Sequence, residues 1–453
     1  MKSFKTIILA AGEGTRMKSK KPKVLHELFH TPMINHVIKA AECCGTESLC
    51  IVVGHKAEEV KKAISNNNIS FALQEQQLGT GHAVMQAMDF LEDDKNILIL
   101  YGDTPLITKE SLQELLAFHE KENNSVSIVS AIVENPSGYG HIIRDEKGNF
   151  LKNIEHKDAS EQQKQIKEIN TGIYCFKGSE LKKALSKLTN HNTQGEYYLP
   201  DTLEIILQSG GKVNALITTD ATAFFGVNSR VQLAEATAIM QNRINQKHME
   251  NGVTIIAPQS TWIDADVEIG QDTIIQPNTI IEGNTIIGED CMIGPNTKLT
   301  NMTIGNAVQI QYTSATSSSI GNSAIVGPFA YIRPDCHIGD GVKVGDFVEV
   351  KNSTVGNGTK IPHLTYIGDT DAGEKINFGC GSITVNYDGN KKHRTVVEDN
   401  VFVGCNTNLV APVTIKKGSY IAAGSTITKN VPENVLAVAR ARQQIIEGWS
   451  KKY

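Results

Sequence analysis

The residues near the start of the chain that are best suited to chemistry form a glycine-containing loop with basic side chains behind it. The loop reads Leu9-Ala10-Ala11-Gly12-Glu13-Gly14-Thr15-Arg16-Met17, and Lys23 follows in Lys21-Pro22-Lys23. Glycines let backbone N–H groups approach phosphates without a side-chain clash, and Arg16 and Lys23 could neutralise a triphosphate. The loop therefore predicts a phosphate cradle, and a tight turn without a ligand is the alternative.

This loop matches neither of two common nucleotide motifs. No Gly-Lys-Ser/Thr follows the glycines, so the loop is not a Walker A motif. Met17 stands where the dinucleotide-binding fingerprint requires its third glycine. The expected phosphate cradle thus belongs to a different class of nucleotide-binding loop.

A second candidate is the carboxylate that follows another apolar run. Residues 97–101 lead into Tyr101-Gly102-Asp103-Thr104-Pro105. A carboxylate at the carboxyl end of a strand, beside a phosphate cradle, is well placed to hold Mg²⁺, which prefers oxygen ligands and bridges phosphates. Taken alone, Asp103 could equally be the N-cap of a helix.

The segments that must position these side chains alternate between strand and helix patterns up to residue 228. Four apolar runs read as strands, each followed by a loop and a helical stretch: 6–9, 49–53, 70–73 and 97–101. This βαβ alternation predicts an α/β fold with a Rossmann-like, mostly parallel sheet and helices on both faces. Ligands are then expected at the carboxyl ends of the strands.

The pattern changes after residue 228. Residues 229–251 read as one long helix that ends at Gly252, and we expect it to link a domain at 1–228 to a domain at 252–453. In the second domain an aliphatic residue recurs every six positions, in runs from Ile269 to Leu299, Ile320 to Val350 and Val403 to Ile427. A six-residue repeat is the signature of a parallel β-helix, in which each coil stacks its aliphatic residue on the previous one.

The repeat does not by itself establish a reaction. A coil of this kind could merely trimerise the chain or space its domains, because a fold does not determine a function. The repeat breaks at 377–395, a stretch rich in Gly, Asn, Lys and Asp. We expect this stretch to leave the coil as a loop, and such loops commonly build sites.

Composition excludes several classes of protein. The 453 residues include 44 Lys and Arg and 49 Asp and Glu, and neither sign collects in a long block, which argues against a nucleic-acid-binding protein. No apolar run approaches the length of a membrane span and the start lacks a signal-peptide cleavage pattern, so we expect no membrane association and a cytoplasmic location. The eight cysteines include no C-x-x-C pair, so neither a disulfide framework nor a zinc site is indicated.

The first domain resembles the sugar-nucleotide pyrophosphorylases, a nucleotidyltransferase family. Their signature Leu-Ala-Ala-Gly-x-Gly-Thr-Arg-Met, with Pro-Lys behind it, is present, and Gln74 with Gln77-Leu78-Gly79-Thr80-Gly81 is similar to their base-recognition loop. Segments 138–140, 155–157 and 168–172 are similar to their sugar-binding parts. The resemblance implies that an oxygen of a sugar 1-phosphate attacks the α-phosphorus of UTP and that pyrophosphate leaves.

By this resemblance, Lys23 and Arg16 are catalytic, and Asp103 and Asn228 hold Mg²⁺. Gln74 and the backbone around Gly79 are expected to read uracil. The residues expected to contact the nucleotide or the sugar are Leu9, Ala10, Ala11, Gly12, Lys23, Gln74, Gly79, Thr80, Tyr101, Gly102, Asp103, Gly140, Glu155, Asn170, Thr171 and Asn228.

The second domain resembles the hexapeptide-repeat acyltransferases, whose coil is a left-handed β-helix. Its motifs are Gly327-Pro328 through Arg333-Pro334, Glu349-Val350-Lys351, Ile361-Pro362-His363 through Gly368, and Asn377 through Asn386-Tyr387-Asp388-Gly389. With both halves in this order, nearly the whole chain is similar to the bifunctional family of N-acetylglucosamine-1-phosphate uridylyltransferases and glucosamine-1-phosphate N-acetyltransferases. The resemblance implies acetylation of glucosamine 1-phosphate by acetyl-CoA, followed by uridylyl transfer to the product.

Acetylating an amine requires the neutral nucleophile, so a base that titrates near the working pH is needed, and histidine is the natural choice. The resemblance implies that His363 is this base, that Glu349 and Asn386 orient it, and that Arg333, Lys351, Tyr366 and Asn377 bind the amino-sugar phosphate. Acetyl-CoA is expected at Cys380, Asn386, Tyr387, Cys405, Ala423 and Arg440, in a groove shared between subunits of a homotrimer. Cys380 and Cys405 depart from the family, many of whose members carry Ala and Ser there.

Two other interpretations compete with a bifunctional enzyme. One keeps uridylyl transfer and makes the coil a trimerising or regulatory module, so it predicts no turnover of acetyl-CoA. The other is a non-catalytic scaffold whose coil presents a binding surface. The set of His363, Arg333 and Lys351 speaks against the first, and the second leaves Asp103 and Lys23 without a purpose.

Overall fold

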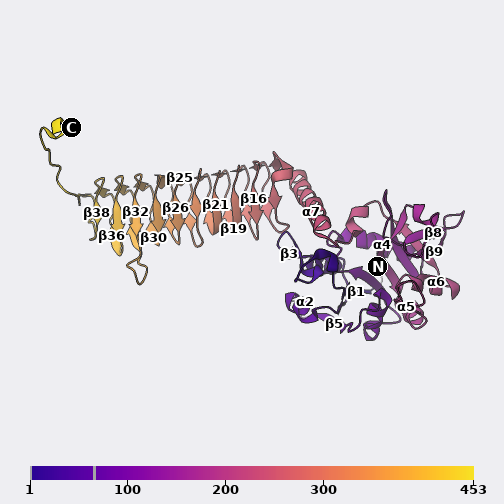
Figure 1. Ribbon diagram of the computed structural model, residues 1–453. Helices are drawn as coiled ribbons and strands as arrows, with labels where there is room; N and C mark the ends of the chain where they lie inside the picture. The colour runs from indigo at the N-terminus through magenta and orange to yellow at the C-terminus, as the bar shows by residue number, and fades with distance from the viewer. Residues whose placement is uncertain (1–2, 65–67, 453) are drawn as a thin grey trace. The chain divides into compact units, whose positions relative to one another are not determined.

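The computed structural model describes residues 3–64 and 68–452, which form two compact units (Figure 1). The first unit extends to Met240 and the second begins at Gln241. This division falls inside helix α7 (Arg230–Glu250), the segment in which one long helix was expected. In the described part of the chain, no helix has the length and apolar character that crossing a membrane requires.

The first unit is built on a mixed sheet of nine strands. Its main path runs β11-β7-β10-β6-β1-β4-β5, and β8 and β9 attach beside β10. The four strands expected from the sequence are present and pair in parallel: β1 (Phe4–Ala10), β4 (Leu49–Val53), β5 (Ile69–Leu73) and β6 (Asn96–Tyr101). The others are β7 (Val126–Ile132), β8 (His141–Arg144), β9 (Phe150–Ile154), β10 (Glu168–Lys177) and β11 (Val213–Ile217), with a separate ribbon of β2 (Glu27–Leu28) and β3 (Thr31–Pro32).

Strand β10 runs antiparallel to both of its neighbours, β6 and β7. Because of this direction, the beginning of β10 lies at the same edge of the sheet as the carboxyl ends of β1 and β6. Tyr174 pairs with Ile99, and the register shifts between Asn170 and Tyr174. Asn170 and Thr171 are thereby brought to the edge at which ligands bind in such folds.

Helices cover both faces of this sheet, as the βαβ pattern predicts. Successive residues of a strand point to opposite faces, so Ile8 belongs to one buried cluster and Ile7 to the other. The helices of the first cluster are α1 (Met33–Cys43), α2 (Ala57–Ala63) and α4 (Lys109–Lys121), and those of the second are α3 (Thr80–Met85), α5 (Gly178–Leu185) and α6 (Asp201–Gln208).

The second unit is a parallel β-helix whose short strands stack from coil to coil (Figure 1). The parallel pairings follow three columns, one for each side of the coil. The first column is an 11-stranded sheet: β12 (Thr254–Ile255), β15 (Ile274–Ile275), β18 (Met292–Ile293), β20 (Gln309–Ile310), β22 (Ile325–Val326), β25 (Lys343–Asp346), β28 (Lys360–His363), β31 (Asn377–Phe378), β34 (Phe402–Val403), β37 (Tyr420–Ile421) and β39 (Leu436–Ala437).

The other two sides together form a 17-stranded sheet, in which β19 and β21 are long enough to span both sides. One side holds β13 (Trp262–Ile263), β16 (Ile280–Glu282), β19 (Lys298–Ile304), β21 (Ser314–Ile320), β23 (Tyr331–Ile332), β26 (Glu349–Lys351), β29 (Tyr366–Gly368), β32 (Ile383–Val385), β35 (Asn408–Val410) and β38 (Thr426–Ile427). The other adds β14 (Glu268–Ile269), β17 (Ile286–Ile287), β24 (His337–Ile338), β27 (Thr354–Val355), β30 (Thr370–Ala372), β33 (Thr395–Val397) and β36 (Val413–Ile415).

The six-residue repeat supplies the core of the coil. Every aliphatic residue of the three predicted runs is buried, except Ile269, which packs against the core from a partly buried position. A single coil has no partner for these side chains, whereas stacked coils bury them in one continuous cluster. The second half of α7 covers the first coil, where Gln241 Nε2 donates to the carbonyl of Thr261 over 2.7 Å and Asn245 is fully buried.

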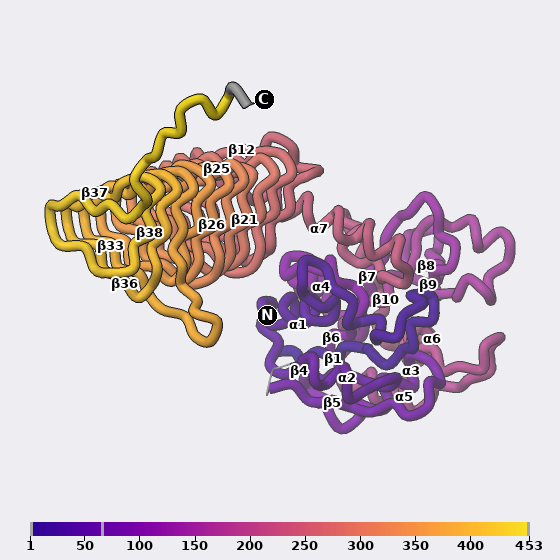
Figure 2. Tube along the Cα trace, turned by 60° about the vertical axis from the view of Figure 1, so that its left-hand side comes forward, coloured from indigo at the N-terminus to yellow at the C-terminus, as the bar shows by residue number. Residues whose placement is uncertain are grey.

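The excursion from the coil is shorter than the predicted break at 377–395. Strands β31 and β32 remain stacked on their neighbours, so the prediction was wrong at its N-terminal side. The reason is that Phe378 and Thr384 still point inward and keep the period of the core. The chain leaves the coil only between Asn386 and β33, in a loop closed by the antiparallel bridge of Tyr387 and Lys392, and this loop projects from the stack (Figure 2).

Candidate active sites

The first unit holds a cavity of about 690 Å³ at the carboxyl edge of its sheet. Small-molecule sites commonly have volumes of roughly 300–1,000 Å³. The cavity is lined by Arg16 and by every residue expected at the nucleotide or the sugar, with the exception of Gly102: Leu9, Ala10, Ala11, Gly12, Lys23, Gln74, Gly79, Thr80, Tyr101, Asp103, Gly140, Glu155, Asn170, Thr171 and Asn228.

Gly102 contributes to packing behind the cavity. Its N–H donates to the carbonyl of Leu9 over 2.9 Å, which ties the ends of β6 and β1 together. A Cβ at this position would lie 3.2 Å from Val24 Cγ1 and 3.3 Å from Ile34 Cδ1. A side chain would therefore press on the core, and the ligand contact expected at Gly102 stays a prediction.

Asp103, Lys23 and Asn228 form the charged centre of the cavity. The ammonium of Lys23 donates to the carboxylate of Asp103 and, over 3.0 Å, to Oδ1 of Asn228. The backbone joins the same residues, because the N–H of Val227 donates to the carbonyl of Asp103 over 2.8 Å. Two oxygen ligands thus converge on one cation, which is the ligand chemistry that Mg²⁺ requires.

The glycine loop is held open beside this centre. Gly14 has φ of 66°, and a Cβ there would lie 2.5 Å from Cβ of Lys23. Only glycine fits a position that is both left-handed and this close to another side chain. The loop therefore passes directly over Lys23, and Arg16 reaches the cavity from the turn that follows.

The proposed base-recognition loop is also ordered by glycine. Gln74 is buried, and its Nε2 donates to the carbonyl of Gly79 over 3.1 Å. Gly79 has φ of 105°, and a Cβ there would lie 2.6 Å from the carbonyl of Tyr197. Gln77 Nε2 donates to the carbonyl of Ala11 over 2.8 Å, so the loop is tied to the phosphate cradle.

At the other end of the cavity, Glu155 lies against the backbone of Gly140. A Cβ on Gly140 would lie 2.9 Å from Oε1 of Glu155, so only glycine leaves room beside this carboxyl. Burial raises the pKa of Glu155 above its ordinary value. Asn170 Nδ2 donates to the hydroxyl of Tyr174 over 2.8 Å, which fixes the amide at the cavity wall.

Several lining residues were missed by the sequence reasoning. They come from the segment before α6, from the segment before α7 and from α7 itself, and include Gln194, Glu196, Tyr198, Phe224 and Gln232. The segment before α6 has no strand or helix period in its sequence. Its place in the cavity wall becomes visible only because it packs against the loop of Gly79 and Gly81. The N–H of Gly81 donates to the carbonyl of Tyr197 over 2.7 Å at that contact.

In the second unit, several of the predicted acetyl-transfer residues follow one another in a single column of the coil. Asp346 pairs with His363 on the next coil, and the pairings of β28, β31, β34 and β37 continue the same column to the residues beyond. The column is Asp346, His363, Cys380, Cys405 and Ala423. At about 4.8 Å per step, His363 lies about 14 Å from Ala423 along the coil.

The contact of His363 corrects one prediction. Nδ1 of His363 lies 2.5 Å from Oδ1 of Asp346, whereas Glu349 pairs with Arg333, with 3.0 Å between Oε1 and NH1. Asp346 therefore takes the orienting place that the resemblance assigned to Glu349. The reason is the ladder register, which sets Glu349 opposite Tyr366 rather than opposite His363.

The Asp346–His363 pair defines the state of the imidazole. Nδ1–H donates to the carboxylate, so Nε2 is the nitrogen that can accept a proton. The hydrogen bond from His363 lowers the pKa of Asp346 below its ordinary value. The carboxylate therefore stays ionised at neutral pH and accepts the hydrogen bond from Nδ1.

Three basic residues, Arg333, Lys351 and Lys392, gather near another side of the coil, where Lys351 lies in a strand of the 17-stranded sheet, and we call them the cation cluster. Arg333 and Lys351 follow each other on adjacent coils, and Lys392 comes from the excursion loop. The hydrogen bond and charge of Lys351 hold the pKa of Lys392 below its ordinary value. Neighbouring ammonium groups repel each other, and a bound anion would relieve this repulsion. Nothing in the sequence indicates that Lys392 would lie close to Lys351.

Asn386 and Tyr387 begin the excursion loop. Asn386 Nδ2 lies 3.3 Å from the hydroxyl of Tyr366 and also donates to Asp369, so it does not contact His363 as the resemblance implied. Tyr387 is exposed, and its hydroxyl donates to the carbonyl of Gly389 over 2.8 Å. Asn377 lies in β31 of the 11-stranded sheet, whereas Lys351 and Tyr366 lie in the 17-stranded sheet, so these residues do not share a strand column.

The residues expected at acetyl-CoA lie further along the column. Cys380 is half-buried, Cys405 is exposed, and Arg440 NH1 donates to the carbonyl of Ala423 over 3.0 Å. The backbone continues the column, because the N–H of Asn406 donates to the carbonyl of Cys380 over 2.7 Å. A long, thin ligand could therefore run along this corner from His363 toward Arg440.

Comparison with known proteins agrees with both halves of the chain. A nucleotidyl transferase family model matches residues 5–265, and a bacterial transferase hexapeptide model of six repeats matches residues 266–301, 317–352 and 394–429. The chain is similar to proteins named bifunctional protein GlmU from several organisms. Its identity is 54% to that of Caldanaerobacter subterraneus subsp. tengcongensis and 55% to that of Thermoanaerobacter pseudethanolicus, each over 99% of this chain and 98% of the relative.

A third relative, from Acetivibrio thermocellus, is 52% identical over 99% of this chain and 97% of its own length. At this identity, the alignments with these relatives cover both domains of the chain almost completely. The chain therefore belongs to the bifunctional GlmU family, the uridylyltransferases and N-acetyltransferases of amino-sugar phosphates that its motifs indicate.

Proposed function

We propose that this chain catalyses two successive reactions at separate sites. Residues 252–453 acetylate glucosamine 1-phosphate with acetyl-CoA, and residues 1–228 transfer uridylyl from UTP to the N-acetylglucosamine 1-phosphate that results. The products are UDP-N-acetylglucosamine and pyrophosphate. The observation that carries this proposal is the Asp346–His363 pair at the head of a column that runs toward Ala423.

For acetyl transfer, the cation cluster holds the sugar phosphate and so brings the amine to His363. Nε2 of His363 takes a proton from the ammonium, and the amine nitrogen then attacks the thioester carbonyl. A C–N bond forms, the C–S bond breaks, and coenzyme A leaves as the thiol after taking up a proton. Asp346 stabilises the imidazolium that forms, because its carboxylate is already bonded to Nδ1.

For uridylyl transfer, the attacking oxygen of the sugar 1-phosphate is already ionised, so the reaction needs no general base. Lys23 and Arg16 offset the negative charge of the triphosphate, and Gln74 and the Gly79 loop position the base. A P–O bond to the sugar phosphate forms and the bond to pyrophosphate breaks. A Mg²⁺ ion held by Asp103 and Asn228 would supply further neutralisation of the phosphates.

One coupled assay tests both activities. The full chain is supplied with glucosamine 1-phosphate, acetyl-CoA, UTP and Mg²⁺, and free thiol and pyrophosphate are followed together. We expect thiol to appear first and pyrophosphate to depend on it. If no thiol forms, and pyrophosphate forms only when N-acetylglucosamine 1-phosphate is supplied, the chain is a uridylyltransferase alone. The coil would then be a trimerising or regulatory module.

A homotrimer belongs to this proposal. In the family, the groove expected to bind acetyl-CoA lies between the coils of two adjacent subunits. An exposed apolar ridge supports it: Tyr312, Phe329, Phe347 and Leu364 follow one another on adjacent coils, and Phe329 stacks on Phe347 with ring centroids 5.3 Å apart. Sedimentation equilibrium should give three times the mass of the chain. We also propose a cytoplasmic location, where UTP and acetyl-CoA are supplied, and cell fractionation tests it.

A further inference from the structure

Asp369 is a buried carboxylate next to the cation cluster, and none of the roles described above uses it. It lies in the turn between β29 and β30, with φ of 49°, and its side chain is 5% exposed. A buried charge of this kind costs free energy unless it is paired and hydrogen-bonded. The partners of Asp369 therefore indicate its purpose.

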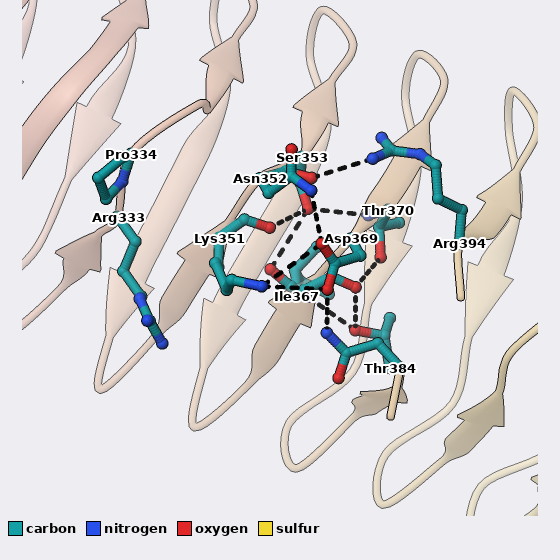
Figure 3. A network of polar contacts seen from close by, with 12 residues as sticks. Arg333, Pro334, Lys351, Asn352, Ser353, Ile367, Asp369, Thr370, Thr384 and Arg394 are labelled. Carbon is teal, nitrogen blue, oxygen red and sulfur yellow. Dashed lines mark hydrogen bonds and ion pairs between the residues drawn. The ribbon is translucent and has the colours of Figure 1, made fainter. Parts of the chain in front are cut away.

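Three side chains donate to this carboxylate (Figure 3). Lys351 Nζ lies 3.2 Å from Oδ2, Asn352 Nδ2 lies 2.5 Å from Oδ1, and Asn386 Nδ2 donates to Oδ2. Burial works to raise the pKa of Asp369, but the hydrogen bonds from Asn352, Lys351 and Asn386 together bring this pKa below its ordinary value. Asp369 is thus an ionised group that only accepts hydrogen bonds.

These donors come from two separate parts of the proposed acetyl-transfer site. Lys351 belongs to the cation cluster, and Asn386 begins the excursion loop that carries Lys392. The backbone of Asp369 reaches the same parts, because its N–H donates to the carbonyl of Lys351 over 3.0 Å and its carbonyl accepts from the N–H of Thr395 over 3.1 Å. Asp369 therefore contacts Lys351 and both ends of the loop.

The charges of Asp369 and the two lysines bear on how the cluster would bind a phosphate. Lys351 and Lys392 carry like charges and lie close enough to interact, so they repel each other. Asp369 offsets the charge of Lys351 from its buried side, since Lys351 is 15% exposed and Asp369 is more deeply buried. Lys392 is exposed, so the open side of the cluster remains available to a phosphate.

We propose that Asp369 is a positioning residue for the phosphate of the amino sugar. A single carboxylate fixes Lys351 and the base of the loop that carries Asn386 and Lys392, and so arranges the cation cluster before the substrate binds. This inference rests on the acetyl-transfer function proposed above. It predicts that the charge and the hydrogen-bond polarity of residue 369 determine the KM for glucosamine 1-phosphate.

The direct test is Asp369→Asn, which keeps the shape and removes the charge. Both carboxylate oxygens accept from N–H donors, so an asparagine must turn its own NH₂ toward either Asn352 or Asn386. Losing a charged hydrogen bond in this way should raise the KM for glucosamine 1-phosphate about 10- to 100-fold. The kcat should change much less, because His363 and Asp346 are not touched.

A second variant restores the match between hydrogen-bond donors and acceptors at positions 352 and 369. In Asp369→Asn with Asn352→Asp, the new asparagine donates to the carboxylate at 352, and its carbonyl oxygen accepts from Lys351 and Asn386. The net charge is that of the original chain, so this variant should recover most of the lost affinity. It also keeps the test decisive if the single variant aggregates, since a folded double variant with a strongly raised KM would overturn the proposal.

The matched control is Asp340→Asn. Asp340 is exposed at a different turn of the coil, and its oxygen Oδ1 accepts from the backbone N–H of Asn322 over 2.6 Å, which an asparagine oxygen can replace. Uridylyl transfer should be unchanged in all three variants. A KM within about twofold of the original in Asp369→Asn removes the positioning role, whereas absence of acetyl transfer in the unaltered chain would instead remove the proposed function.

Discussion

The carboxylate of Asp346 lies 2.5 Å from Nδ1 of His363, directly opposite it on the adjacent coil. The pairing of β25 with β28 sets this distance, so the orientation of the imidazole is built into the ladder of the coil rather than into a loop. A rigid element of this kind holds a catalytic side chain more precisely than a mobile segment does. The pair is therefore the part of the acetyl-transfer site that is easiest to test by substitution.

Asp346→Asn should lower the kcat of acetyl transfer about 10- to 100-fold, which is the usual effect of removing an orienting partner. The KM for glucosamine 1-phosphate should change little, because Asp346 is not part of the cation cluster. Glu349→Gln is the comparison, and its effect should fall mainly on KM through Arg333. The opposite pattern, with kcat lost in Glu349→Gln and kept in Asp346→Asn, would return the orienting role to Glu349.

Asp103→Ala should abolish uridylyl transfer and spare acetylation, because Asp103 and Asn228 supply the oxygens that converge on Lys23. Chelation of divalent ions with EDTA should give the same division between the two activities in the unaltered chain. Pyrophosphate release and thiol release, followed in one mixture, check both results. Retained uridylyl transfer in Asp103→Ala would remove this residue from the metal site.

Lys392→Arg should alter the pH dependence of substrate binding. The pKa of Lys392 is lowered by Lys351, so Lys392 loses its proton first as the pH rises toward the ordinary lysine value of about 10.4. The KM for glucosamine 1-phosphate should then rise on the alkaline side in the unaltered chain. An arginine stays charged over this range, so its KM profile should be flatter. Identical profiles for the two proteins would show that Lys392 does not act on the phosphate.

Alkylation of Cys405 should inhibit acetyl transfer and leave uridylyl transfer intact. Cys405 is exposed in the column between Cys380 and Ala423, so an added group would obstruct a ligand that runs along this corner. Cys405→Ser is the control, because it should be active and should resist the reagent. If Cys405→Ser is inhibited as strongly as the unaltered chain, another thiol is responsible.

The first unit shows how far local pattern extends. The four apolar runs that were expected to be strands are strands. Three of them, β1, β4 and β6, are buried along nearly their whole length and carry a strong signal, whereas β5 is a partly exposed edge strand. Strand β10 was not expected, since Asn170, Thr171 and Gly172 interrupt its apolar period. Only its antiparallel place between β6 and β7 makes it a strand and brings its first residues to the cavity.

The sequence by itself determined the six-residue coil, the βαβ unit and most of the nucleotide cavity, because period and ordered motifs are local properties of a chain. The tertiary structure alone decided which carboxylate meets His363. Asp346 and Glu349 are three positions apart, and the slips between repeats make their partners on the next coil undecidable from spacing. Tertiary structure also determines that Asp369 is buried and that Lys392 lies close to Lys351. Both features depend on where the excursion loop returns to the coil.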